Sequence, residues 1–227
     1  MKLITVSGPP SSGKTSVLTH AIKALITTNQ KTGVVKFDCL TTDDDKLFQA
    51  LNIPVKVGLS GNVCPDHYFV SNIEDCIQWG IAQSLDFLIS ESAGLCNRCS
   101  PHVTGVLAVC VIDNLMGINT PKKIGPMLKY ADIVIITRGD IVSQAEREVF
   151  AFKVRQANPK AKILQINGIT GQGAFELASL FHETNDLTTL NGGKLRFPMP
   201  AALCSYCLGE TKIGQDFQVG NIRKIKI

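Results

Sequence analysis

Short runs of Ile, Val and Leu alternate along the chain with longer stretches in which apolar residues recur at helical spacing. Buried strands of a parallel sheet produce the first pattern, and helices that cover such a sheet produce the second. The short runs predict strands at residues 2–7, 33–38, 85–91, 106–113, 131–137 and 161–167. We therefore expect an α/β fold, with a mostly parallel sheet flanked by helices.

The helical stretches follow the first strand, up to about Asn29, and cover residues 143–157 and 174–182. Near "TLNGGKLRFPMP" the alternation stops, and the remaining segment contains Gly, Pro and two cysteines but no long helical pattern. We predict a main domain over residues 1–190 and a small, cysteine-containing β appendage over residues 191–227.

Composition narrows the class of protein. With 227 residues, of which 44% are hydrophobic, the chain can bury a sizeable core. The net charge is only +4 and the basic residues are scattered, except in the tail "RKIKI", so nucleic-acid binding is not expected. The start "MKLITV" lacks the long apolar segment of a secretory signal, and no stretch reaches membrane-spanning length. We expect a cytoplasmic protein, whose eight cysteines are ligands, redox groups or buried side chains rather than disulfides.

The segment "GPPSSGKTS", residues 8–16, matches the pattern of a P-loop, the turn that surrounds nucleotide phosphates. A predicted strand precedes it and a predicted helix follows, as a P-loop requires. Lys14 would neutralise the terminal phosphates, and the hydroxyl of Thr15 would bind Mg²⁺. The nucleotide-binding residues predicted here are Gly8, Ser11, Ser12, Gly13, Lys14, Thr15 and Ser16.

Two acidic residues, Asp38 and Glu91, end predicted strands. Ligands of open α/β sheets bind at that edge, and a P-loop site needs an acid there to hold the metal ion or position the attacking water. We predict that both acids serve Mg²⁺ together with Thr15, and that they are catalytic together with Lys14. Small residues follow Glu91 and leave room for a phosphate, which favours it over Asp38.

Cysteine pairs with the C-x-x-C spacing occur in "ESAGLCNRCSPHV" (Cys96 and Cys99) and in "LCSYCLGE" (Cys204 and Cys207). Four thiolates would suit Zn²⁺ or an iron-sulfur cluster. About a hundred residues separate the pairs, so only folding or dimerisation could unite them. Both a structural metal that pins the tail and a functional metal site are compatible with this pattern.

The ordered motifs resemble a known family over about residues 1–183. The P-loop is followed by the strand ending in Asp38, then by "GLSGNVCPDHYFVSNIED", "LDFLISESAG", "ADIVIITRGDIV" and "INGITGQGAFEL". This order is similar to that of the SIMIBI-class nickel-handling GTPases, the urease-accessory and hydrogenase-maturation proteins. The resemblance implies a Rossmann-like P-loop NTPase domain, slow hydrolysis of GTP, a nucleotide-dependent homodimer, and delivery of a metal such as Ni²⁺ or Co²⁺ to a client metalloenzyme or its maturation factors.

The chain departs from that family's pattern at two places. Where the family has Asn-Lys-x-Asp, this chain has Thr137-Arg138-Gly139-Asp140. The resemblance implies that Asp140 binds guanine and that Arg138 packs over the base, while the missing Asn removes a contact that fixes the site. In "CPDH" an extra Asp66 precedes the histidine of the family's Cys-Pro-His pattern, so Cys64 and His67 are further metal-ligand candidates with an altered spacing.

The favoured function is a nucleotide-hydrolysing switch that assists metallocentre assembly, with a cysteine site coupled to the nucleotide site. An ATPase that carries an iron-sulfur cluster for electron transfer or partner activation is an alternative. A small-molecule P-loop kinase with a structural zinc is a second alternative.

Overall fold

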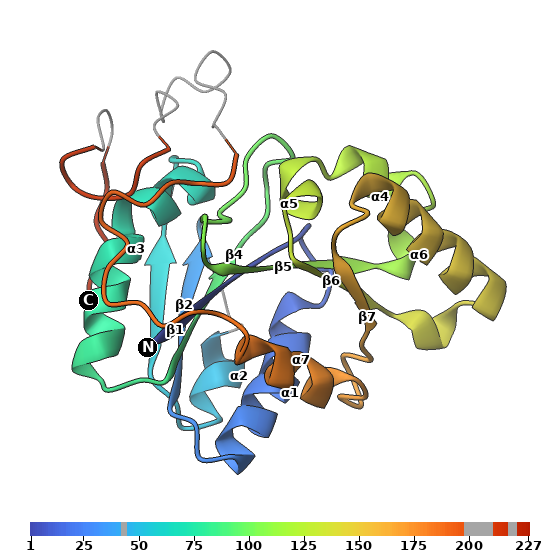
Figure 1. The fold of residues 1–227 in the computed structure, drawn as a ribbon, viewed down its shortest axis with the longest axis horizontal. Coiled ribbons are helices and arrows are strands. Elements are labelled where there is room, and N and C mark those ends of the chain that lie inside the picture. The colour runs from blue at the N-terminus through green and yellow to red at the C-terminus, as the bar shows by residue number, and fades with distance from the viewer. Residues whose placement is uncertain (42–44, 198–210, 218–221) are drawn as a thin grey trace.

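The structure is a computed structural model, which describes residues 1–41, 45–197, 211–217 and 222–227. The described residues form a seven-stranded sheet of order β3-β2-β4-β1-β5-β6-β7, in which every pairing is parallel (Figure 1). The strands are β1 (Lys2–Ser7), β2 (Thr32–Asp38), β3 (Val55–Leu59), β4 (Phe87–Ser92), β5 (Leu107–Asp113), β6 (Ile133–Thr137) and β7 (Lys162–Gln165).

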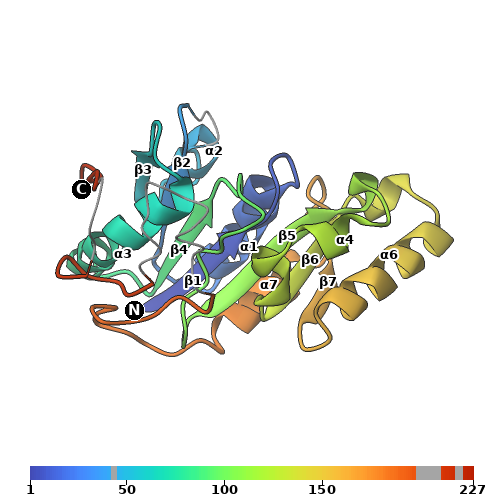
Figure 2. The same ribbon diagram turned by 90° about the horizontal axis from the view of Figure 1, so that it is seen from above.

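Helices cover both faces of this sheet, because alternate strand residues point to opposite sides and are apolar on both (Figures 1 and 2). One face packs against α1, α2 and α7, and the other against α3, α5 and α6. The helices are α1 (Lys14–Thr27), α2 (Asp45–Gln49), α3 (Pro65–Ala82), α4 (Thr120–Lys123), α5 (Pro126–Lys129), α6 (Gln144–Ala157) and α7 (Ala174–Phe181), with 3₁₀ turns η1 (Asn114–Met116) and η2 (Gly139–Ile141). None of the described helices is long and apolar enough to span a membrane.

The six strands and three helical segments expected from the sequence are confirmed, with small shifts at their ends. Strand β3 and helices α2, α3, α4 and α5 were not predicted from the sequence. Strand β3 is a half-buried edge strand with little apolar signal, and α3 is buried along its whole first half, residues 65–73. A helix that is buried on all sides has no polar face, so its period is weak in the sequence.

The described part of residues 191–227 packs against the main body. Leu195, Ile213 and Ile225 belong to the core under α3, and Arg196 forms an ion pair with Asp132 at 2.7 Å. Single antiparallel bridges join Val103 to Leu195 and Lys194 to Lys212, and no strand is formed in this described part. The β structure expected there is thus limited to those bridges. Cys204 and Cys207 lie outside the described residues.

Candidate nucleotide site and thiolate cluster

The P-loop turns from β1 into α1 through two glycines that no other residue could replace without strain. Gly8 has φ 145°, and a β-carbon added there would lie 3.0 Å from the carbonyl carbon of Val111 and closer still to its oxygen. Gly13 has φ 89° and directly precedes α1. The turn therefore places the N-terminus of α1, with its outward-pointing amides, where phosphate would bind.

Lys14 and Thr15, the first residues of α1, line a cavity of about 390 Å³ above the P-loop. The ammonium of Lys14 donates to the carbonyls of Gly8 at 3.0 Å and Pro9 at 2.9 Å. Burial lowers the pKa of Lys14, and the nearby carboxylate of Glu91 opposes this shift. Ser11, Gly13 and Ser16 line the same cavity, whereas Gly8 and Ser12 do not. Arg138, which was expected to pack over the base, lines this cavity as well.

The two strand-end acids meet at this cavity. Glu91 is 1% exposed, and its Oε1 accepts hydrogen bonds from the Thr15 hydroxyl at 2.9 Å and from the Lys36 ammonium at 2.9 Å. The other oxygen, Oε2, is buried and has no hydrogen-bond partner. Asp38 ends β2, with a carboxylate oxygen 3.9 Å from the Lys36 ammonium. A hydroxyl and two carboxylates, one of which has an unsatisfied oxygen, fit a hard cation, so Thr15, Glu91 and Asp38 could hold Mg²⁺.

The segment that follows β6 contacts the P-loop. The Thr137 hydroxyl donates to the carbonyl of Ser12 at 2.8 Å, and the Arg138 guanidinium donates to the carbonyl of Ser11 at 2.8 Å and pairs with Asp113 at 3.1 Å. The sequence analysis expected the missing Asn to cost a contact that fixes this site. Thr137 supplies a contact of this kind, because its short hydroxyl reaches the P-loop backbone directly.

Asp140 lines a second cavity, of about 440 Å³, together with Arg147, Gln165 and Asn167. The loop after β7 encloses this cavity and contacts α1, since a β-carbon added at Gly168 would lie 3.4 Å from Ser16. The second cavity thus flanks the start of the same helix that carries Lys14 and Thr15. The predicted base-binding aspartate and the predicted phosphate-binding residues lie on one side of the molecule.

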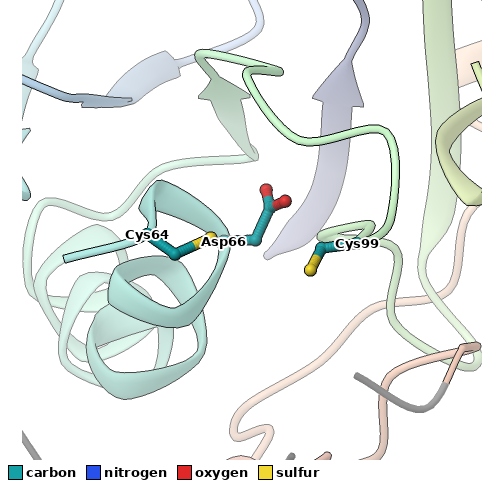
Figure 3. A group of neighbouring side chains, drawn as sticks. All are labelled: Cys64, Asp66 and Cys99. Atoms are coloured by element: carbon teal, nitrogen blue, oxygen red, sulfur yellow. The ribbon is translucent and has the colours of Figure 1, made fainter. Parts of the chain in front are cut away.

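A second group of ligand atoms lies beside the nucleotide site. The sulfurs of Cys64 and Cys99 and a carboxylate oxygen of Asp66 all lie within 4.8 Å of one another (Figure 3). The sulfur of Cys96 lies 3.7 Å from that of Cys99. Cys64 and Asp66 come from the start of α3, whereas Cys96 and Cys99 come from the loop after β4. We call these four residues the thiolate cluster.

The thiolate cluster crowds several acidic groups together, which shifts their pKa values. Hydrogen bonding to Cys99 lowers the pKa of Cys64 to about 7 and that of Cys96 to about 6, while the same contacts raise the pKa of Cys99. Burial, reinforced by the negative charge of Cys64, raises the pKa of Asp66 well above its usual range. A divalent cation would replace the shared protons and neutralise these crowded acidic groups.

The thiolate cluster is connected to the nucleotide site through the loop after β4. The Ser92 hydroxyl donates to Asp66 at 3.1 Å, and Ser92 directly follows Glu91. Gly94 has φ 67°, and a β-carbon added there would lie 2.6 Å from the carbonyl carbon of Gly8 in the P-loop. The backbone that carries Cys96 and Cys99 therefore packs directly on the phosphate-binding turn.

Comparison with known proteins identifies the family of this nucleotide site. The family model described as "CobW/HypB/UreG, nucleotide-binding domain" matches residues 2–165, which include the P-loop, both acids and the segment around Asp140. The chain belongs to this family. Its members are P-loop GTPases, so the chain is a P-loop nucleotide hydrolase, for which GTP and Mg²⁺ are the expected ligands.

Two relatives align with most of the chain. Uncharacterized protein MJ0120 of Methanocaldococcus jannaschii is 48% identical over 225 residues, 99% of this chain and 96% of its own. Urease accessory protein UreG 2 of Methylorubrum extorquens is 29% identical over 199 residues, 79% of this chain and 91% of its own.

Two solved structures of HypB share the fold. The hydrogenase maturation factor HypB from Archaeoglobus fulgidus has a TM-score of 0.63, covering 81% of this chain and 89% of its own. HypB from Helicobacter pylori in complex with nickel has a TM-score of 0.64, covering 81% and 86%. Both are 19% identical to this chain, so they show a shared fold alone.

Two buried histidines lie near these groups, the predicted candidate His67 and the residue His102. His67 is buried and neither ring nitrogen has a hydrogen-bond partner, yet the described ligand group contains Asp66 and not His67. His102 is buried against Thr5 at 3.2 Å and the carbonyl of Met127 at 2.9 Å, and burial lowers its pKa to about 4. His102 is therefore a neutral core residue that joins β1 to α5.

Sequence reasoning missed two residues of these sites, Lys36 and Asp66. Lys36 interrupts the apolar run of "GVVKFD" two residues before the strand-end acid Asp38, and that position was the available signal. Asp66 was treated as an insertion that displaces His67, although it follows Cys64 by two residues at the start of a helix.

Proposed function

We propose that this chain is a GTP-hydrolysing switch that carries a thiophilic divalent metal in the thiolate cluster and delivers it to a client metalloenzyme or its maturation factors. The observation that carries this proposal is the packing of Gly94 on Gly8. Through this contact the loop that bears Cys96 and Cys99 shares a boundary with the turn that binds phosphate. A conformational change in the nucleotide site can therefore move the loop that carries two residues of the thiolate cluster.

At the nucleotide end, this chain's residues bind and orient the triphosphate. The amides at the start of α1 and the ammonium of Lys14 bind the phosphates, and Thr15, Glu91 and Asp38 would hold Mg²⁺. The ion, when bound, neutralises charge on the phosphate oxygens. Asp38, at the end of β2, is positioned to orient the attacking water. Slow, switch-like turnover, which the family resemblance implies, stays a prediction.

At the base end, Asp140 supports a preference for GTP over ATP. Its carboxylate can accept two N–H groups of guanine, whereas adenine presents no matching pair of donors. Thr137 and Arg138 brace the P-loop against this segment, through the carbonyls of Ser12 and Ser11. With the base segment fixed in this way, we propose that the guanine preference is retained despite the missing Asn.

At the metal end, Cys64, Cys96, Cys99 and Asp66 supply three thiolates and one carboxylate. Sulfur-rich sites of this size favour Zn²⁺ among abundant ions and also accept Co²⁺ or Ni²⁺. We treat the ion as cargo, because Cys96 is half-buried and accessible from the surface.

The second cysteine pair, Cys204 and Cys207, stays a prediction. The chain on either side of it is anchored close to the first pair, since Arg196 donates its amide to the carbonyl of His102 at 2.8 Å and Leu195 donates to Thr211 at 2.9 Å. If that pair joins the thiolate cluster, an iron-sulfur cluster becomes chemically possible and the electron-transfer alternative gains support.

We further propose that the nucleotide-bound chain forms a homodimer and acts in the cytoplasm. Leu47 and Leu95 line the mouth of the phosphate cavity and are about half exposed, at 49% and 53%. Apolar side chains at the rim of a nucleotide cavity would be covered by a second copy that closes over the nucleotide.

Metal titration of cysteine variants tests the site. Cys64→Ser and Cys99→Ser should each lose the high-affinity metal, since removal of one ligand leaves an incomplete site. Cys76→Ser is the control, because Cys76 lies in α3, the helix that follows Cys64, and is buried but lies outside the cluster. Cys207→Ser decides whether the tail contributes a ligand. Unchanged metal binding in both Cys64→Ser and Cys99→Ser would exclude the thiolate cluster as the metal site.

A further inference from the structure

Lys36 is a buried charge at the centre of the nucleotide site. It lies in β2 with a relative exposure of 3%, and its backbone neighbour in the adjacent strand β4 is Glu91. The parallel register points both side chains to the same side of the sheet, and their charged ends meet at 2.9 Å. Burial of an ammonium is costly, so its position calls for a role beyond folding.

The Lys36 ammonium shares one carboxylate oxygen with the hydroxyl of Thr15. Glu91 Oε1 accepts from both groups, each at 2.9 Å. Lys36 also lines the same cavity as Lys14. An ion pair that served only to neutralise Glu91 would not require the lysine to form part of the cavity wall, beside the hydroxyl that binds the nucleotide's metal ion.

The basic side chains that line this cavity differ in their position and in their interaction partners. Among the described residues, its basic side chains are Lys14, Lys36 and Arg138. Arg138 is held by Asp113 and by the carbonyl of Ser11, on the side that faces the base segment. Lys14 comes from the P-loop itself. Lys36 approaches from the opposite wall, beside both acids, where the terminal phosphate would lie.

Phosphoryl transfer to water concentrates negative charge on the phosphate oxygens. Water forms a bond to the γ-phosphorus, the bond from that phosphorus to the bridging oxygen breaks, and the diphosphate leaves with the bridging oxygen while the water's proton is released. Positive groups fixed in a poorly solvated site stabilise this charge, and many P-loop enzymes use an arginine for it. A lysine can do the same without gaining or losing a proton.

We propose that Lys36 is a catalytic residue, whose ammonium contacts the terminal phosphate of the bound nucleotide and stabilises the transition state of hydrolysis. The proposal rests on nucleotide hydrolysis and not on metal delivery. If the thiolate cluster proves not to bind metal, the catalytic role of Lys36 is unaffected. If Lys36 proves not to be catalytic, the proposal of metal binding is unaffected.

Single-turnover hydrolysis of GTP with Mg²⁺ tests this role in Lys36→Gln, with Lys31→Gln as control. Lys31 is an exposed lysine just before the same strand. We expect the rate to fall at least about 100-fold in Lys36→Gln, the size of effect seen when one transition-state donor is removed. The affinity for a non-hydrolysable GTP analogue should change less than about tenfold, and Lys36→Arg should restore part of the rate.

Binding of GDP with aluminium fluoride, a mimic of the transition state, separates catalysis from a structural role. Lys36→Gln should lose this binding while it still binds GDP. If Lys36→Gln does not fold, Lys36→Met keeps the aliphatic stem and is judged by the same criteria. An unchanged rate, or a change only in the Mg²⁺ concentration required, would show that Lys36 merely neutralises Glu91. Equal losses in analogue affinity and rate would also overturn the catalytic assignment.

Discussion

Gly94→Ala should weaken both the fold and the nucleotide site, because this glycine packs on the P-loop. The added β-carbon would lie 2.6 Å from the carbonyl carbon of Gly8, where carbon atoms ordinarily stay about 3.5–4.0 Å apart. One backbone segment must therefore move by about an ångström. A non-glycine residue at φ 67° adds strain of about 1–2 kcal/mol.

Comparison with Gly105→Ala separates the cost of the clash with Gly8 from the cost of placing a side chain at positive φ. Gly105 has φ 80° and no atom within 4 Å of an added β-carbon, so this variant bears only the strain of a left-handed backbone. We expect Gly94→Ala to lower the free energy of unfolding by about 1–3 kcal/mol more than Gly105→Ala, the usual cost of overpacking. Urea unfolding with equal m-values measures the difference, and titration with a GTP analogue should show weakened binding in Gly94→Ala alone.

Equal costs in the two variants, with unchanged nucleotide affinity, would refute this reasoning. The loop after β4 would then move away from Gly8 freely, and the contact could not transmit a change between the two sites.

Further predictions concern Lys14, Asp140 and His102. Lys14→Ala should abolish phosphate release while thermal unfolding stays cooperative, since the ammonium acts on phosphates; unchanged turnover would put the active site elsewhere. Asp140→Ala should reduce the preference for GTP over ATP in paired titrations, and an unaffected ratio would contradict guanine recognition. Burial lowers the pKa of His102 to about 4, so below about pH 6.5 the unfolded chain binds a proton that the folded chain does not. Stability should fall as pH decreases from 6.5 towards 4, and His102→Asn should reduce that slope in urea unfolding.

The P-loop and the sheet were predictable because their signals are local. Glycine positions and the Lys14 spacing determine the turn, and fully apolar runs determine the central strands. The positions of Asp38 and Glu91 at one edge followed from the rule that parallel strands end at the same side of a sheet. Each of these inferences needs only neighbouring residues and a general property of α/β folds.

The composition of the thiolate cluster and the ion pair of Lys36 with Glu91 were not predictable from local pattern. Asp66 rather than His67 joins the cluster because α3 begins at Pro65 and packs its first turn beside the loop after β4, which only the tertiary structure determines. Lys36 faces Glu91 because β2 and β4 pair in a particular register, although they lie some 50 residues apart along the sequence. Sequence spacing carries no information on either pairing.

Metal release with and without nucleotide tests the central claim most directly. The normal protein, loaded with Zn²⁺, is mixed with an excess of chelator alone, with GDP and Mg²⁺, or with a non-hydrolysable GTP analogue and Mg²⁺. If the thiolate cluster and the nucleotide site are coupled, the analogue should change the affinity for Zn²⁺ at least about fivefold relative to GDP, and Zn²⁺ should change the affinity for the analogue by the same factor. Identical zinc release and affinity in all three states, with Cys64 and Cys99 confirmed as ligands, would contradict the account and leave the metal as a structural support.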